Sequence, residues 1–223
     1  LSVNELKFIS PSQDGIEIDN INIELNNQIS PQYISINSDI IDCEVEGNYD
    51  FATLAHSVKD IISHHLPALI SAECIETTQN INEPQILNNL NFNFTIKDNN
   101  EILDFINAPI RLIHPIKITG DMDHFAHKLN LDIDAPYLQQ KNKLIKSSHI
   151  SVNVDKNDDL CQFFATTIMP TKKGETLVNL KCNGLNDRVD TKIDWNINNA
   201  KAFNGKIIFS SLFQRNDDNT LFT

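Results

Sequence analysis

Histidines and acidic residues are the side chains of this 223-residue chain that could bind a metal or move a proton, and most of them stand apart. The densest group of such residues is Asp121, Asp123, His124 and His127, whose two histidines are three residues apart. On a helical turn these histidines could share one face, but zinc sites take three or four protein ligands. Because no further ligand follows at a suitable spacing, we interpret the group as polar residues of a connecting turn and predict no metal site.

Other potential ligands are no better spaced. His64 and His65 are adjacent, so their side chains point in different directions on a helix, and His56 is no better placed relative to His65. We interpret all three as solvated side chains. The acidic sequence DKNDD at 155–159 lacks the Gly and the terminal Glu of an EF-hand calcium loop, so we expect a hairpin tip there.

Catalytic motifs are missing from the sequence. The six glycines form no phosphate-binding loop, and neither GxSxG nor HExxH occurs. The four cysteines, Cys43, Cys74, Cys161 and Cys182, form no CxxC pair, which argues against structural zinc and a disulfide framework. Cys43 and Cys182 occupy apolar positions of strand-like runs and are expected to be small buried side chains. A Cys–His pair formed in space, with Cys161 as nucleophile, is the enzymatic alternative, but we predict no enzyme and no cofactor.

The charge balance of the chain limits the classes of partner that it can be expected to bind. With 18 basic and 30 acidic residues the net charge is −12, which disfavours binding to nucleic acid or to anionic lipid headgroups through a basic patch. No run of eighteen apolar residues is present, so we predict no membrane-spanning helix. The chain begins at Leu1 and shows no charged-then-apolar leader, and we therefore expect an internal piece of a longer protein.

Alternation of apolar and polar residues is the dominant pattern and predicts about a dozen antiparallel strands in a meander. Turn-forming residues at 98–100, 155–159, 172–174, 183–187 and 198–199 predict hairpin connections between them. The alternation changes phase at Asp19-Asn20, which predicts a bulge or a tight bend. The clearest alternating runs lie at residues 16–25, 43–51, 90–96, 129–133, 150–154, 178–182 and 189–197.

One segment has helical spacing instead. Apolar residues recur every three to four positions between 53 and 71, which predicts an amphipathic helix with Asp50 or Thr53 as its N-cap. Pro67 should bend this helix or separate its last turn. A second, short helix is expected around 101–107, ahead of Pro109. We therefore expect a single mainly β segment over residues 1–223, with a soft boundary, if any, near 76–88.

The apolar strand faces can be covered in two ways. In a closed sandwich or barrel the faces would cover each other. In an elongated sheet folded into a trough, they would line an open apolar groove. The alternating pattern alone fits both arrangements and favours the sandwich.

The order of several segments is more specific than any one of them. Residues 34–69 read ISINSDIIDCEVEGNYDFATLAHSVKDIISHHLPAL: a strand, the pattern G.Y.F..L, an amphipathic helix and then LP. NFNF at 91–94, the short helix, PIKITGDMDHF and LNLDIDAPYL within 115–138, and IDWNI and FNGKIIFSSLFQR within 193–215 follow. This order resembles the TamB-like translocation and assembly module proteins of Bacteroidetes, members of the AsmA-like, bridge-like group.

The resemblance implies a periplasmic β-sheet folded into a trough (β-taco-like), in a parent protein anchored in the inner membrane. It implies that phospholipid moves between the inner and outer membranes along the groove, with phospholipid acyl chains as partners. Outer-membrane assembly with an Omp85-type barrel would involve other parts of the parent protein. The alternative is a closed β-sandwich that serves as a binding or scaffold module of the cell envelope without lipid transport. The residues expected to line the groove are Phe92, Phe94, Ile96, Leu129, Leu131, Ile133, Ile193 and Trp195.

Overall fold

The computed structural model describes residues 2–3, 6–10, 13–18, 20–28, 30–70, 88–98, 100–105, 108–172, 174–198, 203–216 and 221–222. Within these ranges, the chain forms one large antiparallel sheet of thirteen strands, two small two-stranded sheets and a few short helices. Among the described helices, none is both long and apolar enough to cross a membrane.

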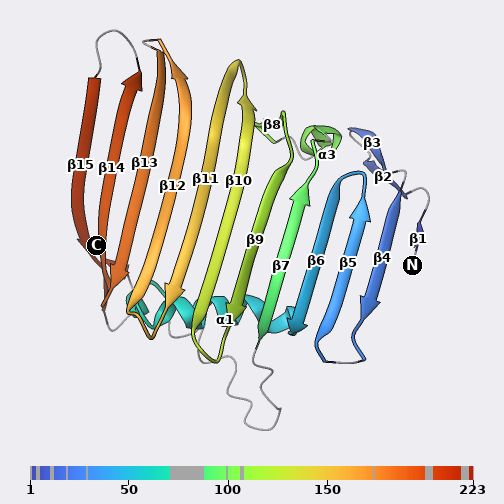
Figure 1. Ribbon diagram of the computed structural model, residues 1–223, viewed down its shortest axis with the longest axis horizontal. Coiled ribbons are helices and arrows are strands. Elements are labelled where there is room, and N and C mark those ends of the chain that lie inside the picture. Colours follow the sequence, from blue (N-terminus) through green and yellow to red (C-terminus); the bar gives the residue numbers. More distant parts are fainter. Residues whose placement is uncertain are drawn as a thin grey trace.

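The large sheet is a meander, as predicted. From β4 onward the neighbours follow chain order, except that β8 pairs on the side with β10 (Figure 1). Its strands are β1 (Ser2–Val3), β4 (Ile21–Asn26), β5 (Gln32–Ser38), β6 (Ile41–Asn48), β7 (Asn89–Ile96), β8 (Arg111–Leu112), β9 (Ile116–Asp123), β10 (Lys128–Gln140), β11 (Lys143–Asp155), β12 (Leu160–Thr171), β13 (Gly174–Leu185), β14 (Arg188–Asn198) and β15 (Phe203–Leu212).

Cross-strand pairing sorts the side chains into rows, because directly opposed residues of neighbouring strands share a face. One row passes from β4 to β15 through Leu25, Ile34, Val45, Phe92, Gly120, Leu131, Val152, Phe163, Cys182, Thr191 and Phe209. The next row on this face passes through Ile23, Ile36, Cys43, Phe94, Ile118, Ile133, Ile150, Ala165, Leu180, Ile193 and Ile207. We call this side of the sheet the apolar face.

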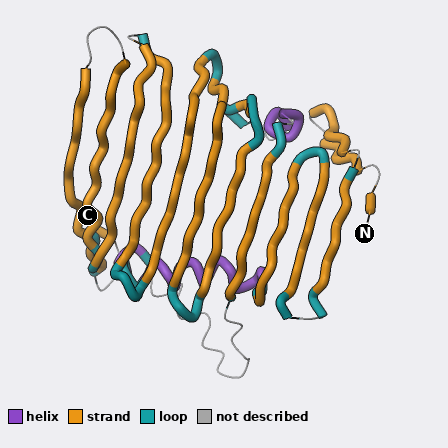
Figure 2. The backbone as a smooth tube through the Cα atoms, in the orientation of Figure 1, coloured by secondary structure: helices purple, strands orange, loops and turns teal. Residues whose placement is uncertain are grey.

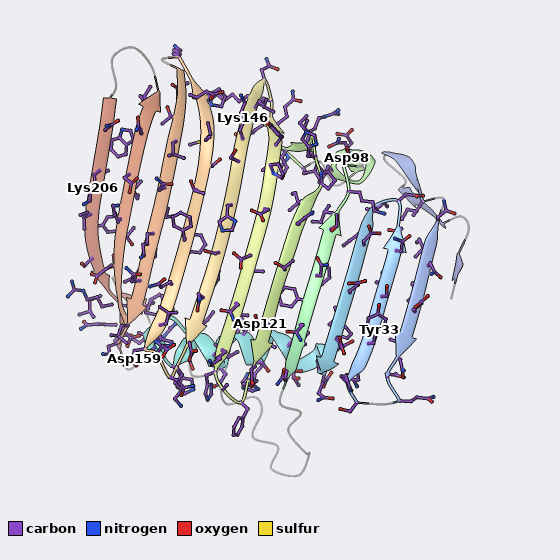
Figure 3. The ribbon with its side chains drawn as sticks, viewed as in Figure 1. Tyr33, Asp98, Asp121, Lys146, Asp159 and Lys206 are labelled. Carbon is purple, nitrogen blue, oxygen red and sulfur yellow. The ribbon has the colours of Figure 1, made fainter. Side chains whose placement is uncertain are left out.

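The opposite side carries mostly polar residues and is called the polar face. Asp121 is paired there with Asn91 and Asn130, and Lys206 with Asp194; both labelled side chains can be followed in Figure 3. Because the apolar rows lie on one side of one open sheet, the described strands form the trough-like arrangement and not two stacked sheets. The predicted fold class is therefore confirmed.

The predicted amphipathic helix is α1 (Phe51–Ser63), which crosses the sheet near one end of its strands (Figure 2). Asp50 caps it, since its side chain accepts a hydrogen bond of 2.9 Å from the backbone N–H of Ala52. The α-helix begins slightly earlier and ends well before residue 71. Pro67 starts a separate 3₁₀ turn, η1 (Pro67–Leu69), as expected of a proline in a helical pattern.

The connection after β7 differs from its prediction. Residues 98–100 do not make a hairpin, because Asn100 begins the helix α3 (Asn100–Phe105). The Asn100 side chain accepts from the N–H of Leu112 at 2.7 Å and donates to its carbonyl at 2.9 Å, and so holds β8 in place. The short helix predicted at 101–107 is confirmed as α3, with residues 106–107 outside the described part of the chain.

Two further sequence signals have a structural counterpart. The phase change at 19–20 marks a change of sheet: β3 (Gln13–Ile18) pairs with β2 (Leu6–Ser10), whereas β4 starts the large sheet. The turn predicted at 183–187 is tighter than expected, since β13 continues to Leu185 and Asn186 and Asp187 both have positive φ. The small strands β16 (Gln214–Arg215) and β17 (Leu221–Phe222) pair near the C-terminal end. The soft boundary near 76–88 and Cys74 fall on residues outside the description, apart from Asn88.

Candidate functional site

All eight residues predicted to line a groove lie on the apolar face. Phe92, Phe94 and Ile96 come from β7, and the pairing of β7 with β9 and of β9 with β10 puts Leu131 and Ile133 in the same rows as Phe92 and Phe94. The same pairing continued to β14 places Ile193 in the row of Ile133, with Trp195 two residues along the strand. Residues about 100 positions apart in the sequence therefore share one surface.

An apolar pocket of about 430 Å³ lies between α1 and this face. Its size falls in the range of small-molecule sites. It contains four of the predicted groove residues, whereas Ile96, Ile133, Ile193 and Trp195 lie on the face outside it. Every lining residue is apolar: Val45, Phe51, Leu54, Ala55, Val58, Leu90, Phe92, Phe94, Met122, Leu129 and Leu131.

The helix α1 packs against the sheet through one apolar side of the helix. Leu54, Val58 and Ile61 are spaced three to four residues apart, so they share a stripe of the helix. Ile61 is completely buried, and Leu54 and Val58 pack against the same cluster. The sheet side of this cluster consists of Cys43, Val45, Leu90, Met122, Leu129 and Val154, with Tyr49 from the residues just ahead of the helix.

A buried asparagine fixes the first turns of α1. Asn88 is fully buried; its side-chain oxygen accepts from the N–H of Asp50 at 2.7 Å. Its amide nitrogen donates to Thr53 Oγ1 at 3.0 Å and to Ser57 Oγ at 2.7 Å. Since Asn88 directly precedes β7, these bonds tie the helix to the sheet. Buried amides of this kind are costly to leave without partners.

The far end of the helical segment is tied to the turn between β13 and β14. The N–H of Ala68 donates to Asp187 Oδ1 at 2.6 Å, and the N–H of Asp187 donates to the carbonyl of His65 at 3.1 Å. Leu66 packs over Gly184, where an added Cβ would lie 3.0 Å from Leu66 Cδ1. The segment 51–69 therefore covers the apolar face near one end of the strands, from β6 to β14.

Away from this segment, the apolar face is more exposed. Ile207 and Phe209 of β15 are 49% and 46% exposed, although they share rows with buried or half-buried residues. Trp195 lies over Gly205, where an added Cβ would come within 2.0 Å of Trp195 Cζ2. Phe92 covers Gly120 in the same manner. In both places a large ring fills the space that the glycine leaves on the sheet.

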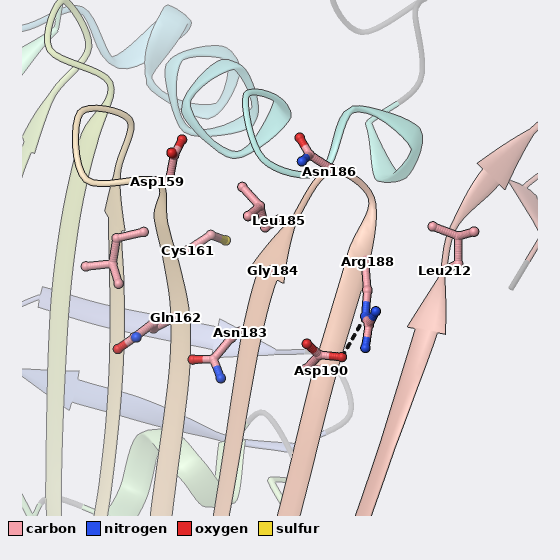
Figure 4. A pocket seen from close by; sticks show the side chains of 11 residues that line it. Asp159, Cys161, Gln162, Asn183, Gly184, Leu185, Asn186, Arg188, Asp190 and Leu212 are labelled. Carbon is pink, nitrogen blue, oxygen red and sulfur yellow. Dashed lines mark hydrogen bonds and ion pairs between the residues drawn. The ribbon is translucent and has the colours of Figure 1, made fainter.

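A second pocket, of about 580 Å³, lies among the turns at the same end of the strands (Figure 4). Its lining mixes apolar residues with the ion pair between Arg188 Nε and Asp190 Oδ1, 2.8 Å apart. Cys161 belongs to this lining, and burial raises the pKa of its thiol. A protonated thiol is a poor nucleophile, and among the described lining residues there is no histidine to activate it.

Two histidines that we interpreted as separate polar groups meet in space, and the prediction that His65 is solvated is wrong, because that side chain is buried. His64 follows the last turn of α1, and His127 lies in the turn between β9 and β10; their Nε2 atoms are 3.1 Å apart. Asp121 and Asp123 do not join them, because Asp121 accepts from Asn130 and Asp123 accepts from the N–H of Ala126. The sequence contained a signal only for Asp60 and His64, whose i,i+4 spacing puts both side chains on one face of a helix, and none for the contact with His127.

Comparison with known proteins adds no identification. No family model matches the chain, and neither the curated proteins nor the solved structures give a match. The family resemblance therefore remains a prediction from sequence, and the function has to be inferred from the geometry of the apolar face.

Proposed function

We propose that this chain is a non-enzymatic lipid-conducting segment whose apolar face holds the acyl chains of phospholipids. The observation that carries the proposal is the continuity of the apolar rows, which cross the sheet from β4 to β15. At a strand spacing of about 4.8 Å, ten steps give a path of about 48 Å. A bilayer core about 30 Å thick contains two leaflets, so the path is roughly three times the length of one acyl chain.

The chemistry of the face suits loose and unselective holding of hydrocarbon. Burial of each CH₂ group contributes about 0.8 kcal/mol, without any directional bond. A chain can therefore move from row to row while its contacts are replaced by equivalent ones. The polar face and the net charge of −12 keep the other side of the sheet in water.

The cellular setting of the proposal rests on the family resemblance. In that setting the segment lies in the periplasm, within a parent protein anchored in the inner membrane. Phospholipid would pass along it between the inner and outer membranes in support of outer-membrane assembly. An Omp85-type barrel would be contacted by other parts of the parent protein.

Photocrosslinking tests the proposal with a matched pair of neighbours. Phe94 lies on the apolar face and Asn93 on the polar face of the same strand. With p-benzoylphenylalanine in place of either residue, and phosphatidylcholine vesicles as the lipid source, we expect a lipid adduct at position 94 and none at position 93. Mass spectrometry identifies the adduct. Equal lipid capture at both positions contradicts the proposal. So does an adduct at position 94 that contains protein and no lipid, which is the result expected of a scaffold surface.

A further inference from the structure

A cluster of histidine and aspartate side chains stands where α1 meets the β9–β10 turn, outside the apolar pocket. Asp60, His64 and His127 each offer a ligand atom, and these atoms all lie within 4.8 Å of one another. From these positions we propose that the three side chains bind a divalent transition-metal ion of the zinc type. The inference does not depend on lipid conduction.

Local structure brings the three residues together for independent reasons. Asp60 and His64 are four residues apart at the end of α1, so their side chains share one face. His127 closes the turn between β9 and β10, where it adopts a positive φ of 50° and its N–H donates to the carbonyl of His124. The packing of α1 on the sheet then places this turn beside the end of the helix.

The positions are close to those needed for ligands of one tetrahedral ion. One nitrogen of each ring and one carboxylate oxygen lie within 4.8 Å of one another, and His127 Nδ1, the ring nitrogen that faces the carboxylate, is 3.5 Å from Asp60 Oδ2. The Nε2 atoms of the two rings are 3.1 Å apart, so the His64 ring has to turn before both rings can bind the same ion. With Zn–N and Zn–O bonds of about 2.0–2.2 Å, two ligand atoms of a tetrahedral zinc are about 3.3–3.5 Å apart. His64 is exposed, so its ring can turn to direct its lone pair at an ion.

A buried ring nitrogen gives a second, independent observation. His127 Nδ1 is buried and makes no hydrogen bond, because Asp60 Oδ2 at 3.5 Å is too distant for a good one. Buried polar atoms without a partner are uncommon and require an explanation. An ion held between the carboxylate and the two rings would provide the missing interaction.

The surroundings favour the ligand form of these side chains. Burial is the main cause that lowers the pKa of His64 and of His127, and an imidazole binds a metal in its neutral form. His124 orients the carboxylate, since its Nε2 lies 3.1 Å from Asp60 Oδ2 and its Nδ1 lies 3.2 Å from Ser57 Oγ. Lys156 and His124 both lower the pKa of the two rings, and Asp60 acts in the opposite direction.

Three protein ligands leave one tetrahedral position for water. An ion at this place would join the end of α1 to the β9–β10 turn. Because the ligands come together only in the folded chain, binding would stabilise the covered end of the sheet.

Metal titration of the EDTA-treated chain tests the site directly. With Zn²⁺ in competition with a chromophoric chelator, we expect one equivalent to bind and the midpoint of thermal unfolding to rise. Co²⁺ should give the intense visible absorption of tetrahedral coordination. His64→Ala and His127→Ala should each weaken binding at least tenfold.

The matched control is His149→Ala. His149 is also paired with a carboxylate, at 2.8 Å from Asp134 Oδ1, but it lies on the polar face away from the cluster. This variant should bind Zn²⁺ as the unmodified chain does. Because His64 is exposed, His64→Ala should retain its circular dichroism spectrum. Failure to bind one equivalent, or unchanged affinity in the folded His64→Ala variant, overturns the site.

Discussion

Two parts of the apolar face have the same strand pattern and different surroundings. One is the part under α1, which we call the covered end, and the other is the edge strand β15, which we call the open end. Under α1, Val154 is 2% exposed and Ile61 is fully buried against it and its neighbours. At β15, Ile207 and Phe209 occupy the same face and remain nearly half exposed. The comparison teaches that alternation determines which face a residue is on, whereas the cover determines whether it is buried. We assign stability mainly to the covered end, whereas lipid is proposed to contact the whole apolar face, which is most accessible at the open end.

The largest effect on stability is expected at the covered end. Ile61→Ala removes a completely buried side chain and leaves a cavity between α1 and the sheet, so it should lower the free energy of unfolding by about 3 kcal/mol. The same truncation at the open end, Ile207→Ala, should lower it by less than about 1 kcal/mol, since Ile207 is half exposed. Urea unfolding followed by circular dichroism measures both. Equal losses would contradict the division into two ends.

A smaller loss of stability is expected when the hydrogen bonds between Asn88 and the first turns of α1 are removed. Asn88→Ala leaves the N–H of Asp50 and two hydroxyl groups without their buried partner, which should lower the free energy of unfolding by about 2 kcal/mol. The control is Asn91→Ala, an exposed residue of the polar face on β7, the strand that Asn88 precedes; it is expected within about 0.5 kcal/mol of the unmodified chain. If the two variants unfold at the same urea concentration, Asn88 is not an anchor of the helix.

The smallest of these effects is expected at the helix cap. Asp50→Ala removes the acceptor for the N–H of Ala52 and should lower the free energy of unfolding by about 1 kcal/mol. Asp50→Asn keeps an oxygen acceptor and should lose little, because asparagine is as good an N-cap as aspartate. A comparable loss in both variants would show that charge, and not the cap hydrogen bond, is responsible. Thermal unfolding of the two variants in parallel distinguishes these outcomes.

Much of the fold was predictable because its signals are local. Period two placed Phe92, Phe94 and Ile96 on one face, and strand pairing in chain order, with α3 and β8 inserted between β7 and β9, extended that face to Trp195. The helix was predictable from its apolar stripe, and its early end from Pro67. The hairpin predicted at 98–100 was wrong because Asn100 uses its side chain on Leu112, a contact that turn chemistry does not reveal.

The features that could not be predicted from the sequence depend on contacts between distant segments. His64 and His127 are 63 residues apart, and only the docking of α1 on the sheet brings their rings together. The choice between a sandwich and a trough was also open in the sequence, since the same alternation serves both. It was decided by how the strands pair, which is a property of the whole sheet.

The central claim is that the apolar face, and not apolar character in general, holds lipid. Phe209 and Ile208 are adjacent on β15, lie on opposite faces and are both exposed, with Ile208 the more exposed at 63%. With p-benzoylphenylalanine at each position in turn and phosphatidylcholine vesicles present, the most direct measurement is the yield of lipid adduct. We predict capture at position 209 and little at position 208. Equal or greater capture at position 208 would contradict the account.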